Sequence, residues 1–244
     1  MPATDDDLAP PAQTYDEWLR SYDSARRADD RQALAADVVI LTIVDGALSV
    51  LLCRRTEWPA YGSWVLPGAF VRKNEWFDDA ARRALDEQAG LRGNRRLDRL
   101  NFFDSPERDP YTQVGSLAYI CLCGPGEATT AVRAPHRTLG TIVGDTIHLN
   151  GAPIQLGFAQ DKIVSYACND VRRRLQADPL WIVPAISDDD TFTVAGLNAA
   201  RQTLGAGMTD DALRRKVAAD HRIRQVGWVD AGTGKASRLY RVST

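Results

Sequence analysis

The sequence predicts an α+β protein with two folded parts. Runs of β-branched and apolar residues at 37–44 and 48–54, separated by an Asp-Gly turn, predict a pair of strands. Residues 78–89 carry apolar side chains at helical spacing, which predicts a helix in the same part. Two short helical patterns and then two strand-like runs lie between residues 191 and 243, which predicts a smaller C-terminal part.

Composition bounds the class of protein. The chain has 244 residues, of which 44% are hydrophobic and 25% charged, as in ordinary globular proteins. It lacks a run of about 18 apolar residues, so we expect no membrane association. The N-terminus lacks the basic and apolar regions of a secretory signal, so we expect a cytoplasmic protein. The four cysteines lack metal-binding spacing, which predicts buried thiols, no zinc site and no cofactor.

Charge is distributed unevenly along the chain, although the net charge is only −2. Residues 1–34 form an acidic extension, in which we expect disorder over 1–13 and a short helix over 14–33. From Arg201 onward, nine basic side chains stand against four acidic ones. A basic final segment on a nearly neutral chain favours contact with a polyanion; a solvated basic face is the alternative.

Local signals predict the remaining elements. Strands are expected at 63–66, 99–103 and 114–123, a hairpin within 141–151, and an amphipathic helix at 158–176. The rest of 124–157 shows no regular pattern. We expect the helix at 158–176 to begin the connection between the parts, which gives domains at 35–157 and 158–244.

Threonine residues predict where the two helices of the C-terminal part begin. A helix is expected from a threonine cap at 191 or 193 through Leu204. A second helix is expected after Thr209, with Leu213 and Val217 as its buried pair. Strands at 223–229 and 237–243 complete this part.

Residues 67–91 resemble the Nudix box. That family's pattern is G-x5-E-x7-R-E-U-x-E-E-x-G-U, in which U is aliphatic, and a Pro-Gly pair and a Trp-containing strand precede it. The chain matches at the required spacings with Glu75, Arg83, Leu85, Glu87, Gly90 and Leu91, after Trp64 and Pro67-Gly68. The resemblance implies a Nudix α/β/α sandwich over residues 35–157.

Three positions of the box differ from the family pattern. Ala69 replaces the first glycine, Ala84 replaces the glutamate after the arginine, and Gln88 replaces the second glutamate of the pair. In the family these glutamates hold divalent cations, and Mg²⁺ needs anionic oxygen ligands to activate water. Glu87 alone supplies too little charge, so we expect no metal, no catalytic residue and no enzyme activity.

An active hydrolase with relocated metal ligands is the alternative. The acidic residues near the box are Asp78, Asp79 and Asp86. The Glu75–Arg83 pair also has a simpler interpretation, as an ion pair that joins a loop to a helix.

The C-terminal part has the element order of a winged helix-turn-helix. In that motif the second helix enters the major groove and the hairpin reaches along the DNA backbone. Arginine suits guanine edges, and lysine suits phosphates. The DNA-binding candidates are Thr209, Asp210, Arg214, Arg215 and Lys216 on or beside the second helix, with Lys235 and Arg238 on the hairpin.

A degenerate Nudix box followed by this part resembles the Nudix-related transcriptional regulators (NrtR type). The resemblance spans about residues 37–242, with LRRKV at 213–217 and RLYR at 238–241 as matched segments, whereas 124–157 matches poorly. It implies a homodimeric transcription regulator, such as a repressor, that binds a near-palindromic double-stranded DNA operator. It also implies a small-molecule effector: ADP-ribose, another nucleotide sugar or a phosphorylated metabolite.

The Nudix fold implies a ligand cleft beside the box. The ligand-binding candidates are Arg54, Arg55, Trp64, Glu75, Arg83, Glu87, Phe102, Phe103 and Tyr111. Aromatic rings would stack on a base, and arginines would hold a diphosphate. As structural alternatives, Trp64 and Phe102 would be core residues, and Arg54 and Arg55 would be surface charges.

The leading hypothesis is therefore a ligand-responsive DNA-binding transcription regulator with a non-hydrolytic Nudix domain. One alternative is a Nudix hydrolase that cleaves a nucleoside diphosphate derivative, which Mg²⁺-dependent release of phosphate or AMP would support. Another is a protein-interaction adaptor, which predicts no affinity for any duplex.

Overall fold

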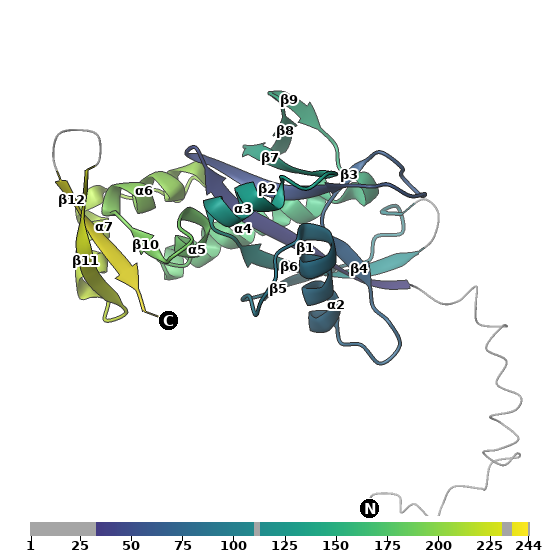
Figure 1. Cartoon of the computed structure of the whole chain (residues 1–244), viewed down its shortest axis with the longest axis horizontal. Helices are drawn as coiled ribbons and strands as arrows, with labels where there is room; N and C mark the ends of the chain where they lie inside the picture. Colours follow the sequence, from purple (N-terminus) through teal and green to yellow (C-terminus); the bar gives the residue numbers. More distant parts are fainter. Residues whose placement is uncertain (1–32, 110–112, 231–235, 244) are drawn as a thin grey trace, which may run out of the picture. The chain divides into compact units, whose positions relative to one another are not determined.

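The computed structural model describes residues 33–109, 113–230 and 236–243 (Figure 1). The expected disorder over 1–13 and the expected helix up to residue 32 lie outside these residues, whereas Ala33, the last residue of that expected helix, begins a strand. Within the described part of the chain, no helix has the length and apolar character needed to cross a membrane.

A mixed sheet forms the centre of the larger part, with strand order β5-β6-β1-β2-β7-β8-β9. Strand β3 pairs with β2, and β4 pairs with β1. The pair β1–β6 is parallel, and the others are antiparallel. The strands are β1 (Ala33–Val44), β2 (Ala47–Arg54), β3 (Trp64–Val65), β4 (Gly68–Phe70), β5 (Asp98–Phe103), β6 (Val114–Leu122), β7 (Arg137–Val143), β8 (Thr146–Leu149) and β9 (Ala152–Ile154).

Strand β1 shows why its sequence is a continuous apolar run. Val39 and Leu41 face one hydrophobic core, whereas Val38 and Ile40 face another on the opposite side of the sheet. All four side chains are fully buried. A strand covered on both faces has no solvent side for polar residues, so its pattern does not alternate.

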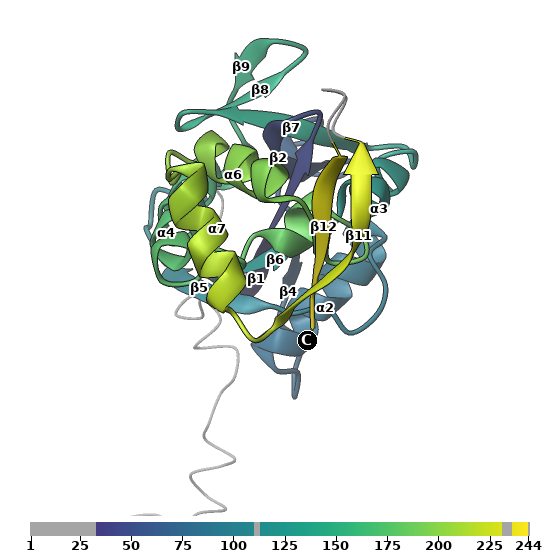
Figure 2. The ribbon, with the colours of Figure 1, turned by 90° about the vertical axis from the view of Figure 1, so that its left-hand side faces the viewer.

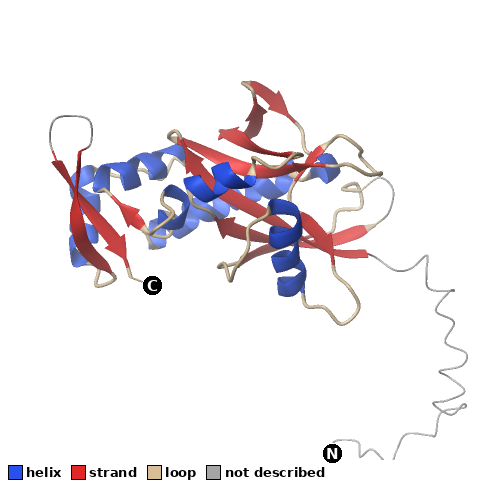
Figure 3. Cartoon of the chain, viewed as in Figure 1, coloured by secondary structure: helices blue, strands red, loops and turns tan. Residues whose placement is uncertain are grey.

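Helices cover both faces of this sheet (Figure 3). On one side lie α2 (Phe77–Ala84), the π-helical turn η2 (Leu85–Ala89) and α3 (Pro125–Ala131). On the other lie α4 (Asp161–Ala177) and α5 (Val183–Ile186). The short 3₁₀ turn η3 (Gly157–Ala159) precedes α4, and its Phe158 packs against the core on the α2 side. The predicted helix over 78–89 is confirmed as helical, but its second half is a π-helix rather than an α-helix. It ends at Gly90, whose left-handed φ of 71° favours glycine.

Helix α3 was not predicted, and an acid remote in sequence caps it. The Asp188 carboxylate accepts hydrogen bonds from the backbone N–H of Gly126 at 2.9 Å and of Glu127 at 3.0 Å. Added Cβ atoms at Gly124 and Gly126 would collide with Asp188, so these glycines admit the cap. The segment before the C-terminal part is thereby tied to the larger part.

We expect Asp188→Ala to lower the free energy of unfolding by about 1 kcal/mol, because two donors at the start of α3 lose their acceptor. Urea denaturation followed by circular dichroism measures the change. Asp188→Asn keeps one acceptor oxygen and should lose less. Equal stability of the alanine variant and the unchanged protein would contradict the capping role.

The C-terminal part contains α6 (Val194–Thr203), α7 (Asp210–Ala219) and a sheet of order β10-β12-β11 (Figure 2). Its strands are β10 (Thr191–Phe192), β11 (Ile223–Asp230) and β12 (Ala236–Val242). Thr193 caps α6 by accepting from the Gly196 N–H at 3.0 Å, and Thr209 caps α7 by accepting from the Ala212 N–H at 3.3 Å. The predicted order of two helices and a hairpin is confirmed, whereas β10 was not predicted.

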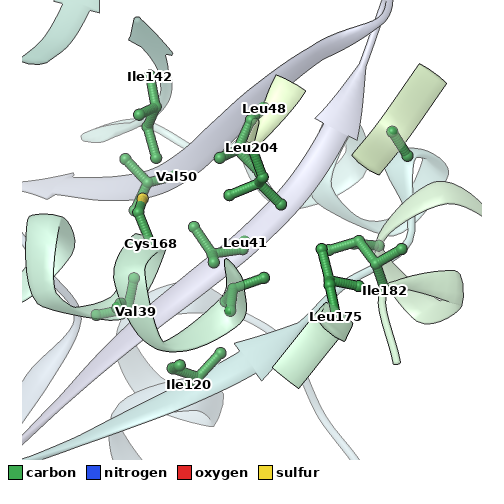
Figure 4. Close-up of a cluster of buried hydrophobic side chains, with 14 of the residues drawn as sticks. Val39, Leu41, Leu48, Val50, Ile120, Ile142, Cys168, Leu175, Ile182 and Leu204 are labelled. Carbon is green, nitrogen blue, oxygen red and sulfur yellow. The ribbon is translucent and has the colours of Figure 1, made fainter. Parts of the chain in front are cut away.

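One hydrophobic core joins the two parts. It contains side chains from β1, β2, α4 and α5 and continues into α6 and α7. Leu204 lies near Leu48 and Val50 of β2, and Leu175 of α4 lies near Ile182 (Figure 4). Helix α4 packs on the sheet as well as beside the C-terminal part, so the domain boundary at residue 157 stays a prediction.

Candidate ligand site and nucleic-acid interface

The residues at two altered positions of the box, 84 and 88, make contacts that leave little room for a cation. Ala84 is 1% exposed and belongs to the core beneath α2. The Gln88 side chain pairs with the Gly68 backbone: its Oε1 accepts from the Gly68 N–H at 3.0 Å, and its Nε2 donates to the Gly68 carbonyl. A glutamate at 88 could not donate to that carbonyl, so the amide is specifically used.

These residues do not fit the divalent cation that the Nudix fold implies. Ala84 offers no ligand, the Gln88 amide already satisfies Gly68, and Glu87 is an exposed carboxylate that lies 3.9 Å from Arg83 Nη1. Asp78 is hydrogen-bonded to Tyr119 and Arg99. Among the described residues, no group of three or more acidic, histidine or cysteine side chains is placed to hold a metal.

The structure forms the loop-to-helix ion pair expected between Glu75 and Arg83. Arg83 donates from Nε and Nη2 to the two Glu75 oxygens at 2.9 Å each, and Nη2 also donates to the Phe70 carbonyl at 2.8 Å. The hydrogen bonds with Arg83 lower the pKa of Glu75 to about 2. This geometry holds the loop against α2 rather than presenting either charge to a ligand.

A pocket of about 190 Å³, here called pocket A, opens beside Gly68 and Gln88. Phe70, Phe158 and Val114 supply apolar walls. Phe158 has a φ of 59°, an uncommon conformation for a residue with a side chain, and its ring lies 5.2 Å beneath the Arg55 guanidinium. Apolar walls with a few fixed polar groups are typical of a small-molecule site.

Buried polar groups form the floor of pocket A. Asp37 is 4% exposed and forms an ion pair with Arg108, and it accepts hydrogen bonds from Ser116 at 2.8 Å and from Gln160 at 3.0 Å. Gln160 in turn accepts from the Leu66 N–H at 2.7 Å. Burial raises the pKa of Asp37, although Arg108 opposes this shift. Because each of these buried polar groups is hydrogen-bonded or ion-paired to another, the side chains of the floor are held in fixed positions.

A second pocket of about 370 Å³, pocket B, adjoins pocket A. Arg55, Val65 and Gln88 line both pockets. Pocket B is polar: its charged lining residues are Arg54, Arg55, Glu57, Glu87 and Arg137. Together the two pockets offer an apolar chamber and a charged chamber side by side.

The structure brings three of the predicted ligand residues to these pockets. Arg55 lines both, and Arg54 and Glu87 line pocket B. Trp64, Glu75 and Arg83 line neither, and Tyr111 lies outside the described residues.

The predicted aromatic residues take other positions. Trp64 packs against the core on the α4 side, with the Arg54 guanidinium 5.7 Å above its ring. Phe102 and Phe103 line a separate hollow with Lys162. Phe102 is 41% exposed, so the alternative of a core residue is wrong for it.

Helix α7 presents the predicted cationic residues to solvent. Arg214, Arg215 and Lys216 are exposed, whereas Leu213 and Val217 are buried against the core. Arg214 lies 3.5 Å from Asp211, a surface contact that is worth little. The apolar pair therefore holds the helix, and three consecutive cations remain available.

Two other predicted DNA-binding residues have structural contacts. Thr209 is the cap of α7, and the Asp210 carboxylate accepts from Asn198 Nδ2 at 2.7 Å, which joins α6 to α7. On the hairpin, Arg238 lies 5.6 Å above the exposed ring of Trp228. Lys235 lies outside the described residues.

Several residues of the site were missed from the sequence. Asp37 carried one signal, because it is an acid at the start of an apolar run of a buried strand. Arg108, Arg137, Phe158 and Gln160 carried none, since they reach the pockets only through long-range packing.

Comparison with known proteins identifies the class of the larger part: residues 32–138 match the family model of the NUDIX domain, so the chain contains a Nudix domain over this range. A curated relative, the ADP-ribose pyrophosphatase of Methanocaldococcus jannaschii, is 29% identical over 127 residues. The match covers 52% of this chain and 70% of the relative.

Solved structures resemble nearly the whole chain. NrtR of Shewanella oneidensis, solved with a 27mer DNA, superposes with a TM-score of 0.72 and 22% identity over 86% of this chain and 93% of that one. A MutT/nudix family protein from Enterococcus faecalis superposes with a TM-score of 0.69 and 20% identity, over 95% and 94%. The fold is thus a Nudix domain followed by a C-terminal domain, as in NrtR.

We expect Gln88→Glu to create a dependence on divalent cations that the unchanged protein lacks. A carboxylate facing the Gly68 carbonyl places two acceptors together, which should lower stability by about 1 kcal/mol. A cation between these oxygens would recover it. Thermal melting with EDTA or Mn²⁺ measures both effects, with Gln88→Ala as the control that gains no carboxylate. A Mn²⁺ response equal in the two variants would contradict the expectation.

Proposed function

We propose that the protein is a ligand-responsive DNA-binding transcription regulator. Its Nudix domain binds a nucleoside diphosphate metabolite such as ADP-ribose without hydrolysing it, and its C-terminal part is a winged helix-turn-helix. The exposed cationic run Arg214–Lys216 on the second helix carries the proposal, because helix-turn-helix proteins place that helix in the major groove. The similarity in fold to a regulator solved with DNA supports it.

The non-hydrolytic part of the proposal rests on the box. The Gln88 amide is committed to Gly68, and Ala84 is packed into the core. The ligand class rests on pockets A and B and on a curated relative whose name is ADP-ribose pyrophosphatase. Binding without cleavage would let the ligand change the conformation of the shared core and thereby the affinity for DNA.

A homodimer on a near-palindromic operator is part of this proposal. Two copies of α7 would then read two half-sites about one helical turn apart, as in other dimeric helix-turn-helix proteins. Sedimentation of the protein on its operator duplex tests the stoichiometry of two chains per site.

The first experiment is fluorescence anisotropy with a duplex from the gene's own upstream region, at 50 mM salt, with and without ADP-ribose, NAD and sugar phosphates. We expect nanomolar, salt-sensitive binding that one metabolite shifts. No binding to this duplex or to unrelated DNA would overturn the proposal and favour the adaptor hypothesis.

A second candidate is a Nudix hydrolase with atypical metal ligands. The match to a pyrophosphatase and the carboxylate of Glu87 in pocket B favour it. Release of AMP from ADP-ribose that requires Mg²⁺ and is lost in Glu87→Gln would establish it over the non-hydrolytic sensor.

A further inference from the structure

We propose that pocket B is a metal-independent site for a phosphate or diphosphate group, with Arg55 and Arg137 as its cationic ligands. The inference rests on the proposed function, because it describes how the same Nudix domain would hold the charged portion of its ligand. It follows from the position of these two arginines and from the misfit of the box to a cation.

Arg137 is positioned by the sheet and by the end of the box helix. It begins β7 opposite Cys53 of β2, and its guanidinium lies against Gly90 at the end of η2. A Cβ at position 90 would collide with it. Its Nη1 lies 3.4 Å from the Ala131 carbonyl, and in the described part of the chain its Nε and Nη2 have no hydrogen-bond partner. The Arg137 side chain is therefore held in position, while most of its N–H donors remain available to a ligand.

Arg55 is held in a similar way at the junction of the two pockets. Its Nε donates to the Pro59 carbonyl at 2.6 Å, and its guanidinium stacks on the Phe158 ring. Its two terminal nitrogens have no hydrogen-bond partner within residues 33–109, 113–230 and 236–243. A guanidinium that is already oriented loses little entropy when it binds a phosphate, and its parallel donors match two phosphate oxygens.

The other charges of pocket B favour an anion. Three arginines line it against two glutamates, Glu57 and Glu87. Glu87 already has Arg83 as a partner at 3.9 Å. Hydrolases that bind a diphosphate through Mg²⁺ need carboxylates beside it, whereas here guanidinium groups can neutralise the phosphates directly.

Because Arg55, Val65 and Gln88 line both pockets, one ligand can occupy them together. A nucleoside would fill pocket A, between Phe70 and Phe158, and its diphosphate would pass Arg55 into pocket B. The ligand class is then a nucleoside diphosphate derivative that binds without a bridging metal.

The test is isothermal titration of the full chain with inorganic pyrophosphate and with ADP-ribose, each in EDTA and in Mg²⁺. We expect both to bind in EDTA. Arg137→Gln should weaken both by about 10- to 100-fold, since a hydrogen bond to a charged group is lost. Arg133→Gln is the matched control, because Arg133 is exposed and lies outside pocket B. Melting temperatures of both variants show whether the fold is preserved.

Binding that requires Mg²⁺, or equal affinity of the Arg137 and Arg133 variants for pyrophosphate, would overturn the inference. Failure of the proposed function looks different. In that case pyrophosphate binds in EDTA and depends on Arg137, but no duplex binds. Conversely, the affinity for the duplex could change with ADP-ribose only when Mg²⁺ is present. That result would support the proposed regulator but would contradict a metal-independent phosphate site.

Discussion

Replacing Arg214 and Arg215 together by alanine is expected to weaken duplex binding by at least about 30-fold, because each exposed guanidinium on α7 would contribute about 1–3 kcal/mol at a base or phosphate. The substitutions leave the buried Leu213 and Val217 in place, so the fold should be unchanged. If both arginines contact phosphates, the slope of log affinity against log salt should also fall by about 2.

Fluorescence anisotropy across 50–200 mM salt measures both quantities. The charge-matched control replaces Arg92 and Arg133, two exposed arginines of the Nudix domain, by alanine. This control should lose little affinity. An α7 variant that binds as tightly as the control would show that α7 is not the DNA-reading helix and would move the interface to the hairpin with Trp228 and Arg238.

Replacing Arg201 is expected to have the largest effect on stability. Arg201 of α6 is 2% exposed, and it donates to the Leu175 carbonyl of α4 at 2.9 Å and to the Ala206 carbonyl at 2.7 Å. Burial lowers the pKa of Arg201 from its ordinary value. Arg201→Ala would leave the buried Leu175 carbonyl and the partly buried Ala206 carbonyl without this donor and would open a cavity in the core, so we expect a loss of about 3–5 kcal/mol.

Guanidinium chloride denaturation measures this loss. Arg201→Met fills most of the volume but supplies no donor, so its loss should lie between zero and that of alanine. Because Arg201 ties the last turn of α4 to α6, the alanine variant should also weaken operator binding more than its folded fraction explains. A methionine variant as stable as the unchanged protein would show that the hydrogen bonds contribute nothing net, as happens for some buried charges.

The two parts of the molecule are connected by contacts between residues far apart in the sequence, which no local sequence pattern predicts. Asp188 caps α3, and Asp178 and Asp220 both bind Arg222, with distances of 2.8 Å from Asp178 and 2.7 Å from Asp220. Arg201 provides a third connection, and this one joins α4 to α6. Under the proposed function, a ligand in the Nudix domain would act on α7 through these links and the shared core.

The sequence alone determined the strands β1 and β2, the helix of the box, the Thr209 cap and the order of the C-terminal elements, and it narrowed the cap of α6 to Thr191 or Thr193, of which the structure uses Thr193. Each rests on neighbours within a few residues: an Asp-Gly turn, a hydroxyl three positions before an N–H, a glycine after the last turn. It also determined that the box had lost two glutamates, because fixed spacing is a property of the chain itself.

Only the tertiary structure decided which contacts the replacement residues of the box make and which side chains surround them. Gln88 turns its amide to Gly68, 20 residues away, and Asp37 meets Arg108 and Gln160 across 71 and 123 residues. The helix of the box widens into a π-turn, so the α-helical spacing assumed for its last residues did not hold. Such pairings depend on which strands become neighbours in the sheet, and this follows from the packing of the whole chain rather than from any segment of it.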